Sequence, residues 1–262
     1  MAVLLEVCVD TLEGAEAAVR GGAGRIELCA ALSEGGLTPS AGLMQAAARL
    51  PVPVHAMIRP RSGLFRFTEA ETGIMLADIR AARDAGLAGV VIGVQGADGG
   101  LDVDLLTRLV TEARGMAATL HRVIDVVPDP LAALDQAAGL GIARVLTSGA
   151  KPFAPDGVGL IAEMVHRAEG RIGVMPGCGL KPANVAAVIA ATGACEVHAA
   201  CNARVPGDPA LSDFEPPGGM IGFLVTADRI LESLKGGFEH RHSEMKKRLE
   251  PGSPWRPQRP RS

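Results

Sequence analysis

Residues 4–30 read LLEVCVDTLEGAEAAVRGGAGRIELCA. An apolar run opens this stretch at 4–9 and another closes it at 25–30, and each has the length of a buried strand. Between them, residues 11–21 carry apolar side chains at helical spacing and end at a glycine, a common helix terminator. The stretch therefore predicts one strand–helix–strand unit of a parallel sheet.

The same rhythm continues along the chain. Short apolar runs bounded by turn residues occur at 4–9, 25–30, 53–59, 89–94, 117–122, 144–148, 172–176 and 196–201. Segments with helical spacing follow them at 11–21, 40–50, 69–86, 102–114, 130–141, 156–169, 182–193 and 226–236. Eight alternating units of this size predict an α/β fold, a single (β/α)₈ or TIM barrel, closed or partly open. A doubly wound open sheet is the alternative.

The composition excludes several classes of protein. The 262 residues are 48% hydrophobic and 21% charged, which is enough apolar mass for one large core. No apolar run reaches the roughly 18 to 20 residues of a membrane span, and Glu6 and Asp10 interrupt the apolar start. Five cysteines, an odd number inside apolar segments, indicate reduced thiols. We therefore expect a cytoplasmic protein with no membrane partner.

Charge separates a barrel domain at 1–236 from a tail at 237–262. Residues 235–262 hold eight Lys or Arg and three Glu, a formal charge of +5, whereas residues 1–234 carry −8. An acidic body argues against nucleic acid as a partner. The tail has four prolines in its last twelve residues. We expect it to be partly helical at 239–249 and then disordered.

Polar side chains alternate with apolar ones in several strands, although a strand buried on both faces should be almost entirely apolar. Because the apolar set must pack under the helices, the polar set points toward the barrel axis. Buried charges are costly unless they are paired, so we predict a ligand or metal pocket at the carboxyl ends of the strands. The inward set comprises Glu6, Cys8, Asp10, Glu27, Cys29, His55, Met57, Arg59, Thr119, His121, Glu196 and His198.

Four residues are candidates for acid–base work on a small anionic ligand. Arg59 leaves the third strand on its inner face, where a guanidinium can clamp an anion. His121 is a candidate general base or acid, held by Asp125 or by a neighbouring Glu, and Glu27 is its counterpart. A purely structural polar network is the alternative for all four.

Glycine-rich turns follow the sixth and seventh strands, as TSG at 147–149 and PGCG at 176–179. Ser148, Gly177 and Gly179 can bring backbone N–H groups close to an oxyanion near the start of the next helix. Arg61 is a further anion-binding candidate, or a charge on the rim. Glycines also follow barrel strands for steric reasons, so both interpretations stay open.

Cys8 and Cys29 are the candidate metal ligands. Both occur in a Glu-x-Cys pattern on neighbouring strands, which lie about 4.8 Å apart, so two thiols at similar heights can reach one soft ion. Two thiolates suit Cu(I), whereas structural Zn(II) takes four ligands. Core packing is the alternative role, and barrel stagger can place the two sulfurs at different heights.

With these residues in view, the sequence resembles the CutC family of copper homeostasis proteins. The resemblance implies a fold similar to a TIM barrel, a cytoplasmic homodimer or larger homo-oligomer, and copper as the bound ion. It matches the family's candidate copper cysteines to Cys8 and Cys29. The polar barrel interior of the family coincides with Glu6, Glu27, Arg59, Arg61, His121, Arg122, Asp125 and His198. The matching stretches are 4–40, 55–63, 120–125, 129–134, 144–149, 174–179 and 196–199.

Three motifs depart from the family pattern. The family reads R-P-R-G-G-D-F-x-Y, P-G-G-G and F-H-R-x-F-D where this chain has RPRSGLFRF at 59–67, PGCG at 176–179 and LHRVID at 120–125. Two functions stay open. One is Cu(I) binding through the barrel cysteines. The other is an enzyme acting as an isomerase, lyase or hydrolase on a small anionic or phosphorylated metabolite, and neither function calls for a nucleotide cofactor.

Overall fold

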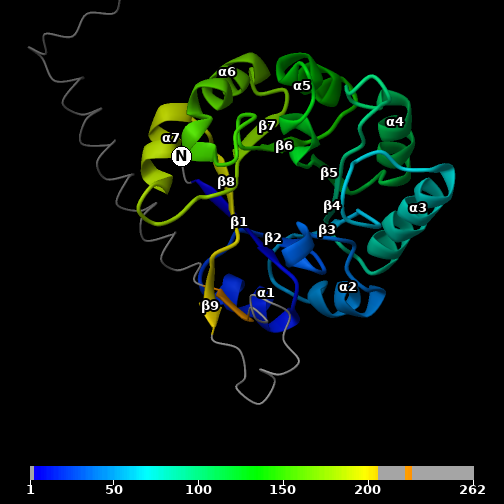
Figure 1. Cartoon of the computed structure of the whole chain (residues 1–262). Coiled ribbons are helices and arrows are strands. Elements are labelled where there is room, and N and C mark those ends of the chain that lie inside the picture. Colours follow the sequence, from blue (N-terminus) through cyan, green and yellow to red (C-terminus); the bar gives the residue numbers. More distant parts are fainter. Residues whose placement is uncertain (1–2, 206–221, 226–262) are drawn as a thin grey trace, which may run out of the picture.

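The computed structural model describes residues 3–205 and 222–225. Eight parallel strands form a nearly closed barrel, and helices surround it (Figure 1). The predicted barrel is thus confirmed, and the doubly wound sheet is excluded. The strands are β1 (Leu4–Val9), β2 (Arg25–Leu28), β3 (Val54–Met57), β4 (Gly89–Ile92), β5 (Ala117–Leu120), β6 (Arg144–Thr147), β7 (Gly173–Pro176) and β8 (Glu196–Ala199). The helices are α1 (Leu12–Arg20), α2 (Ala41–Ala47), α3 (Glu69–Asp84), α4 (Val103–Glu112), α5 (Pro130–Gly139), α6 (Val158–Ala168) and α7 (Val185–Thr192).

The strand order is β7-β6-β5-β4-β3-β2-β1-β8, so the first strand pairs with the last. β7 and β8 lie side by side across the remaining seam. No backbone ladder joins these two strands in the part of the chain that the structure describes. The register places Cys8 opposite Glu27 and Glu6 opposite His198. This register fixes the height of each inward side chain in the barrel.

Side chains at the helix N-termini satisfy backbone N–H groups that have no partner within the helix. Thr68 and Glu71 form a capping box at the start of α3, in which each side chain accepts a hydrogen bond from the other's backbone N–H. Ser40 caps α2, and Asp129 caps α5 just before Pro130. These caps fix the residues at which the loops at the carboxyl end of the barrel give way to helices.

Each strand has an apolar outer face and a more polar inner face. In β1, Leu5, Val7 and Val9 are at most 3% exposed and belong to the main core, which lies between strands and helices. Glu6, between Leu5 and Val7, is fully buried and faces His198 inside the barrel. The predicted alternation, with apolar side chains under the helices and polar ones inside the barrel, is therefore confirmed in β1.

An ion-pair network fills the barrel below the site. Arg25 of β2 donates to Glu6 of β1 and, at 2.5 Å, to Glu196 of β8. Arg144 of β6 donates to the same Glu196 carboxylate and to Thr119 Oγ1, both at 3.1 Å. Because each buried charge is paired and hydrogen-bonded, the fold tolerates it. The network spans the seam, since Glu196 lies on one side of it and Arg144 on the other.

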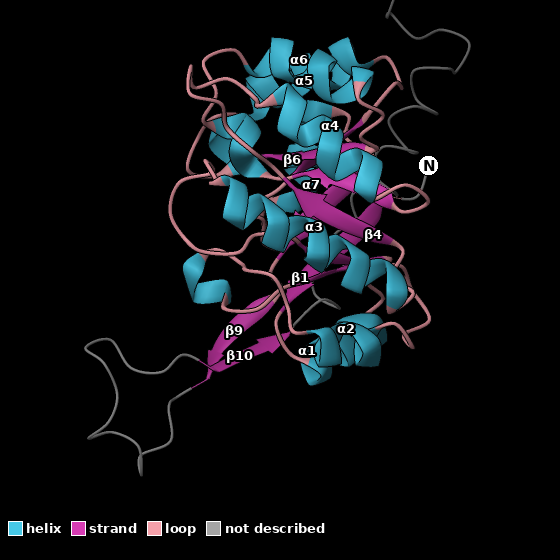
Figure 2. Ribbon diagram, turned by 90° about the vertical axis from the view of Figure 1, so that its right-hand side faces the viewer, coloured by secondary structure: helices cyan, strands magenta, loops and turns pink. Residues whose placement is uncertain are grey.

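Two short strands lie outside the predicted pattern. β9 (Asn202–Val205) and β10 (Gly222–Val225) pair antiparallel, and β10 lies beside α1 (Figure 2). The predicted helix at 226–236 and the predicted tail at 237–262 lie outside the described residues, so both stay predictions. None of the described helices is both long and apolar enough to span a membrane.

Candidate functional site

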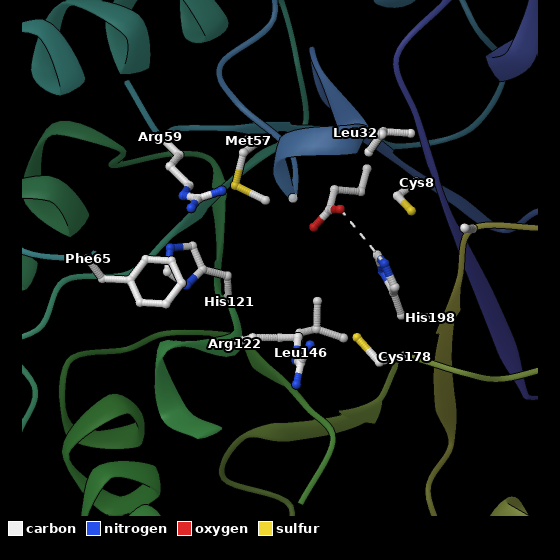
Figure 3. A pocket seen from close by; sticks show the side chains of 13 residues that line it. Cys8, Leu32, Met57, Arg59, Phe65, His121, Arg122, Leu146, Cys178 and His198 are labelled. Carbon is white, nitrogen blue, oxygen red and sulfur yellow. Dashed lines mark ion pairs between the residues drawn. The ribbon is translucent and has the colours of Figure 1, made fainter. Parts of the chain in front are cut away.

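A pocket opens inside the barrel at the carboxyl ends of the strands, where the sequence predicts the site (Figure 3). Its volume is about 270 Å³. Strands β1, β2, β3, β6 and β8 and the loops after β2, β3, β5, β7 and β8 contribute residues to its wall. The apolar part includes Leu32, Met57, Phe65 and Leu146, and the polar part comprises Cys8, Glu27, Arg59, His121, Arg122, Cys178 and His198.

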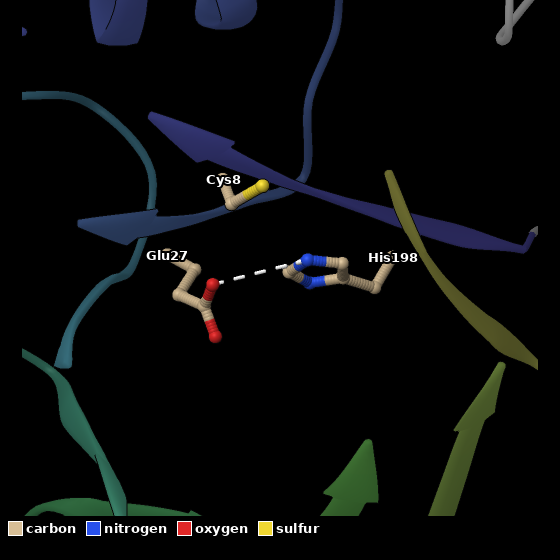
Figure 4. Close-up of side chains that lie close together, drawn as sticks. All are labelled: Cys8, Glu27 and His198. Atoms are coloured by element: carbon tan, nitrogen blue, oxygen red, sulfur yellow. Dashed lines mark ion pairs between the residues drawn. The ribbon is translucent and has the colours of Figure 1, made fainter. Parts of the chain in front are cut away.

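Cys8, Glu27 and His198 form a cluster on one wall of the pocket (Figure 4). The register brings them together because Cys8 faces Glu27 across the β1–β2 ladder, and Glu6 faces His198 across the β1–β8 ladder. One thiol sulfur, one carboxylate oxygen and one imidazole nitrogen lie within 4.8 Å of one another. This donor set can hold a metal ion.

The imidazole of His198 is fixed between two carboxylates. Its Nδ1 lies 2.9 Å from Glu6 Oε1, and its Nε2 lies 3.8 Å from Glu27 Oε2. Burial alone would lower the pKa of His198, but the charges of Glu27 and Cys8 and the hydrogen bond to Glu6 outweigh it and raise that pKa well above its usual value. Burial would raise the pKa of Glu6, yet His198 and Arg25 lower it to about 2. His198 and Glu6 therefore form a charged pair.

Glu27 has one oxygen near His198, and its other oxygen, Oε1, is buried without a hydrogen-bond partner. Burial raises the pKa of Glu27 against the lowering effect of the His198 charge. A carboxyl group with a raised pKa and an unpartnered oxygen is suited to proton transfer. The acid–base role of Glu27 stays a prediction.

Cys29 lies outside the cluster of Cys8, Glu27 and His198. Its Sγ is 3.6 Å from Glu27 Oε2, and its side chain is fully buried beside Met57. Burial, followed by the charge of Glu27, raises the pKa of the Cys29 thiol well above its usual value. The register explains the placement: Cys8 faces Glu27, so Cys29 lies one pleat further along the barrel. The predicted binding of one metal ion by both Cys8 and Cys29 stays a proposal.

His121 lies on the opposite wall, immediately after β5. Its Nδ1 accepts a hydrogen bond from the backbone N–H of Val123 at 3.1 Å, and its ring packs against that of Phe65 at a tilt of 42°, with centroids 4.6 Å apart. Only a glycine fits at position 93, because a Cβ there would lie 2.2 Å from Cε1 of His121. Burial, assisted by the charge of Arg59, lowers the pKa of His121 to about 3. The imidazole is therefore neutral, and its buried Nε2 has no partner.

Arg59 carries a buried positive charge on the same wall as His121 (Figure 3). Its Nη1 donates to the carbonyl oxygens of Glu34 and Gly36, and its Nη2 donates to the carbonyl oxygen of Gly63, at 3.0 to 3.2 Å. Its Nε is buried without a partner. Carbonyl oxygens thus hold the guanidinium in place without neutralising its charge.

Asp125 does not hold His121, which corrects the role predicted for it. Residues Arg122–Asp125 form a 3₁₀ turn that directs the carboxylate toward the loop after β6. Asp125 pairs with Arg122 Nε at 2.9 Å. Its oxygens also accept hydrogen bonds from Thr147 Oγ1, Ser148 N, Ser148 Oγ and Ala150 N, at 2.6 to 3.1 Å. The carboxylate is therefore fully engaged in holding this loop.

The turns predicted to bind an anion are largely satisfied from within the protein. The N–H of Ser148 donates to Asp125, and the N–H of Gly177 donates to the carbonyl oxygen of Thr147 at 2.9 Å. Gly179 has φ +72°, and a Cβ there would lie 2.7 Å from the ring of Phe153. The geometry favours the steric role for these glycines, because a Cβ on Gly177 would also clash, at 2.4 Å from Leu146 Cδ1. The donors of Ser148 and Ala150 are already occupied by the carboxylate of Asp125.

Arg61 holds the loop after β3 rather than lining the pocket. Its Nε pairs with Glu71 Oε1 at 2.5 Å, and its Nη2 donates to the carbonyl oxygen of Arg66 at 2.7 Å. The guanidinium also lies over the ring of Phe67, with 5.2 Å to the centroid. Of the two roles considered for Arg61, the structure fits the rim charge.

The model of the CutC family matches this chain over residues 3–203. The chain belongs to the CutC family. A CutC family protein of Agrobacterium fabrum is 53% identical over 207 residues, which cover 79% of this chain and 82% of the relative. The copper homeostasis protein cutC homolog of Mus musculus is 46% identical over 202 residues, which cover 77% and 74%. A crystal structure of a CutC protein from Streptococcus agalactiae superimposes with TM-score 0.73 at 29% identity, covering 76% of this chain and 98% of that one.

Arg25 and Phe65 are among the residues of this CutC barrel interior that were not predicted from the sequence. Arg25 shares the inner face of β2 with Glu27, so the same period-two pattern contains the signal that would place it inside. Phe65 packs against His121 at a tilt of 42° and lies under Arg59, but it belongs to a loop. No periodicity governs a loop, so no sequence signal pointed to Phe65.

Proposed function

We propose that this chain binds Cu(I) inside the mouth of its barrel and serves in copper handling, in keeping with the name of its mouse relative. The observation that carries the proposal is the cluster of Cys8, Glu27 and His198, whose donor atoms lie within 4.8 Å of one another. Thiolate is a soft ligand that selects Cu(I), and imidazole also suits copper. Cys8 and His198 are therefore the expected ligands.

The contact between Glu6 and His198 supports the imidazole as a ligand. A metal-binding His usually directs its second ring nitrogen to a carboxylate, which fixes the tautomer and the ring orientation. Here Nδ1 lies 2.9 Å from Glu6, and Nε2 faces the wall with Glu27. A metal ion replaces the proton on Nε2, so uptake of Cu(I) releases protons and tightens as the pH rises.

Cys29 is the second sulfur of the proposed site. Its Sγ lies 3.6 Å from Glu27 Oε2, so it can approach the ion if that carboxylate moves aside. Its full burial and raised pKa oppose thiolate formation, whereas Cys8 is only partly buried. We therefore assign Cys8 the larger share of the affinity.

Anaerobic titration of the reduced full-length protein with Cu(I), against a competing chelator, tests this site. We expect one ion per chain, at least a tenfold loss of affinity in Cys8→Ser and in His198→Gln, and a smaller loss in Cys29→Ser. Cys195→Ser is the matched control, because Cys195 is exposed immediately before β8, at the opposite end of the barrel. Wild-type affinity in both Cys8→Ser and His198→Gln would reject the site.

Zn(II) is the metal to compare with Cu(I). One Cys, one His and one Glu also form a three-ligand set of the kind that open zinc sites use. The soft thiolate favours Cu(I), so we expect Zn(II) to bind more weakly under the same conditions. Zn(II) that displaces Cu(I) at equal concentration would contradict this assignment.

We also infer that the chain works in the cytoplasm as a homo-oligomer. Cys8, Cys29, Cys178 and Cys195 are free thiols, as a reducing compartment favours. Leu64, Val126 and Phe153 are more than half exposed on loops near the mouth of the barrel, which supports contact with a second copy. Light scattering during size-exclusion chromatography measures the assembly, and a monomer at micromolar concentration would contradict the inference.

A further inference from the structure

The wall opposite the proposed copper site holds hydrogen-bond donors that lack acceptors. Four buried side-chain atoms in the described part of the chain have no partner, and three of them belong to pocket residues: Glu27 Oε1, Arg59 Nε and His121 Nε2. Buried polar atoms in folded proteins are nearly always paired. Unpartnered groups that converge on one pocket point to a ligand that completes them.

The hydrogen bond at Nδ1 fixes the proton of His121 on Nε2. Because Nδ1 accepts from the backbone N–H of Val123, a neutral ring carries its single proton on Nε2. Burial keeps the ring neutral, since it lowers the pKa of His121 to about 3. His121 therefore offers one N–H donor and no charge.

Arg59 supplies the charge on this wall. Its guanidinium donates to three carbonyl oxygens, keeps Nε unused, and has no carboxylate partner within the described ranges. The ring of Phe65 covers both Arg59, at 5.2 Å, and His121, at 4.6 Å. Arg59, Phe65 and His121 all line the pocket.

We propose that this pocket binds a small monoanionic carboxylate, whose two oxygens accept hydrogen bonds from Arg59 Nε and His121 Nε2. One positive charge and one neutral donor match a carboxylate better than a phosphate dianion, because the loop donors after β6 already hold Asp125. The cavity of about 270 Å³ equals roughly nine water volumes. It therefore suits a metabolite of a few carbon atoms. The proposal is independent of copper.

Calorimetric titration of the full-length protein tests this site with lactate and propionate as probes. Their neutral amides and inorganic phosphate serve as comparison ligands. We expect at least one carboxylate to bind with one site per chain and at least tenfold more tightly than its amide and than phosphate. Equal binding of acid and amide, tighter binding of phosphate, or no binding of either carboxylate would overturn the proposal.

Variants then locate the site. His121→Asn keeps an acceptor for the N–H of Val123 but loses the donor at Nε2, so we expect its affinity for the carboxylate to fall at least tenfold. The longer side chain in His121→Gln restores that donor, so its affinity should stay within about threefold of wild type. Arg59→Met should lose at least tenfold and Arg167→Met, the charge-matched control on the helical surface outside the pocket, less than twofold. If Arg59→Met does not fold, the two His121 variants decide. Equal binding by His121→Asn and wild type would overturn the assignment.

The two proposed sites fail separately. Cys8→Ser should lose Cu(I) and keep the carboxylate within twofold, and His121→Asn should do the reverse. Loss of carboxylate binding in Cys8→Ser without loss in His121→Asn would contradict the placement of the carboxylate on the wall of Arg59 and His121.

Discussion

His121 and His198 are buried imidazoles on opposite walls of one pocket, and their surroundings give them different protonation states. His198 lies between Glu6 and Glu27 and is a cation. His121 has Arg59 and the ring of Phe65 beside it and stays neutral. The neighbours of each ring, rather than the residue type, set its protonation state. The cationic ring can form an ion pair with a carboxylate, whereas the neutral ring can only donate a hydrogen bond to one.

The neutral state of His121 predicts a loss of stability in mild acid. Its pKa is about 3 in the folded protein and about 6.5 in the unfolded chain, so between pH 6.5 and pH 3 the unfolded chain takes up the proton and the folded protein does not. Between pH 7.5 and pH 5, we expect the free energy of unfolding of wild type to fall by about 2 kcal/mol more than that of His121→Gln.

Urea unfolding at both pH values measures this difference. His166→Gln is the control, because His166 is exposed on α6 and is solvated in both states. An identical pH dependence in wild type and His121→Gln would show that His121 is protonated in the folded protein.

Among the elements, the strands were predictable and the loops were not. Alternation along β1 and β2 places Glu6, Cys8 and Glu27 inside from sequence alone, because a strand has a fixed period of two. The height of Cys29 relative to Cys8 depends on the barrel register, which no single strand encodes. The position of Asp125 depends on a 3₁₀ turn and on the loop after β6, two segments without a regular period.

The end of β4 provides a test of how tightly an element fits against His121. A Cβ on Gly93 would lie 2.2 Å from His121 Cε1, so Gly93→Ala should destabilise the protein by about 2 kcal/mol or more and weaken carboxylate binding. Gly73→Ala in α3 is the matched control, since nothing lies within 4 Å of its Cβ position. It should stabilise the protein by roughly 0.5 to 1 kcal/mol. Thermal unfolding of both variants checks this, and equal effects would contradict the packing argument.

For the whole molecule, the buried ion pairs link strands that the backbone ladder does not join. Arg25 connects β2 to Glu6 of β1 and Glu196 of β8, and Arg144 reaches Glu196 across the seam from β6. The family match over residues 3–203 covers this network and the pocket above it. The barrel therefore holds a network of paired charges and, above it, a pocket in which several polar atoms have no partner.

Removing Arg25 tests the structural layer. Arg25→Met leaves the carboxylates of Glu6 and Glu196 with one cation fewer, so we expect a loss of roughly 3 to 5 kcal/mol in the free energy of unfolding. Arg167→Met removes an exposed pair with Asp135 on the helical surface and should cost less than about 1 kcal/mol. A loss as small for Arg25→Met as for Arg167→Met would show that the network contributes little to closure.

X-ray absorption at the copper edge tests most directly whether the wall of Cys8 and His198 holds Cu(I). The sample is reduced full-length protein loaded anaerobically with one equivalent of Cu(I), measured beside Cys8→Ser loaded in the same way. We expect a Cu(I) spectrum with sulfur and imidazole nitrogen as neighbours of the ion, and loss of a sulfur neighbour in Cys8→Ser. Copper surrounded only by oxygen and nitrogen, or a sulfur signal unchanged in Cys8→Ser, would contradict the account.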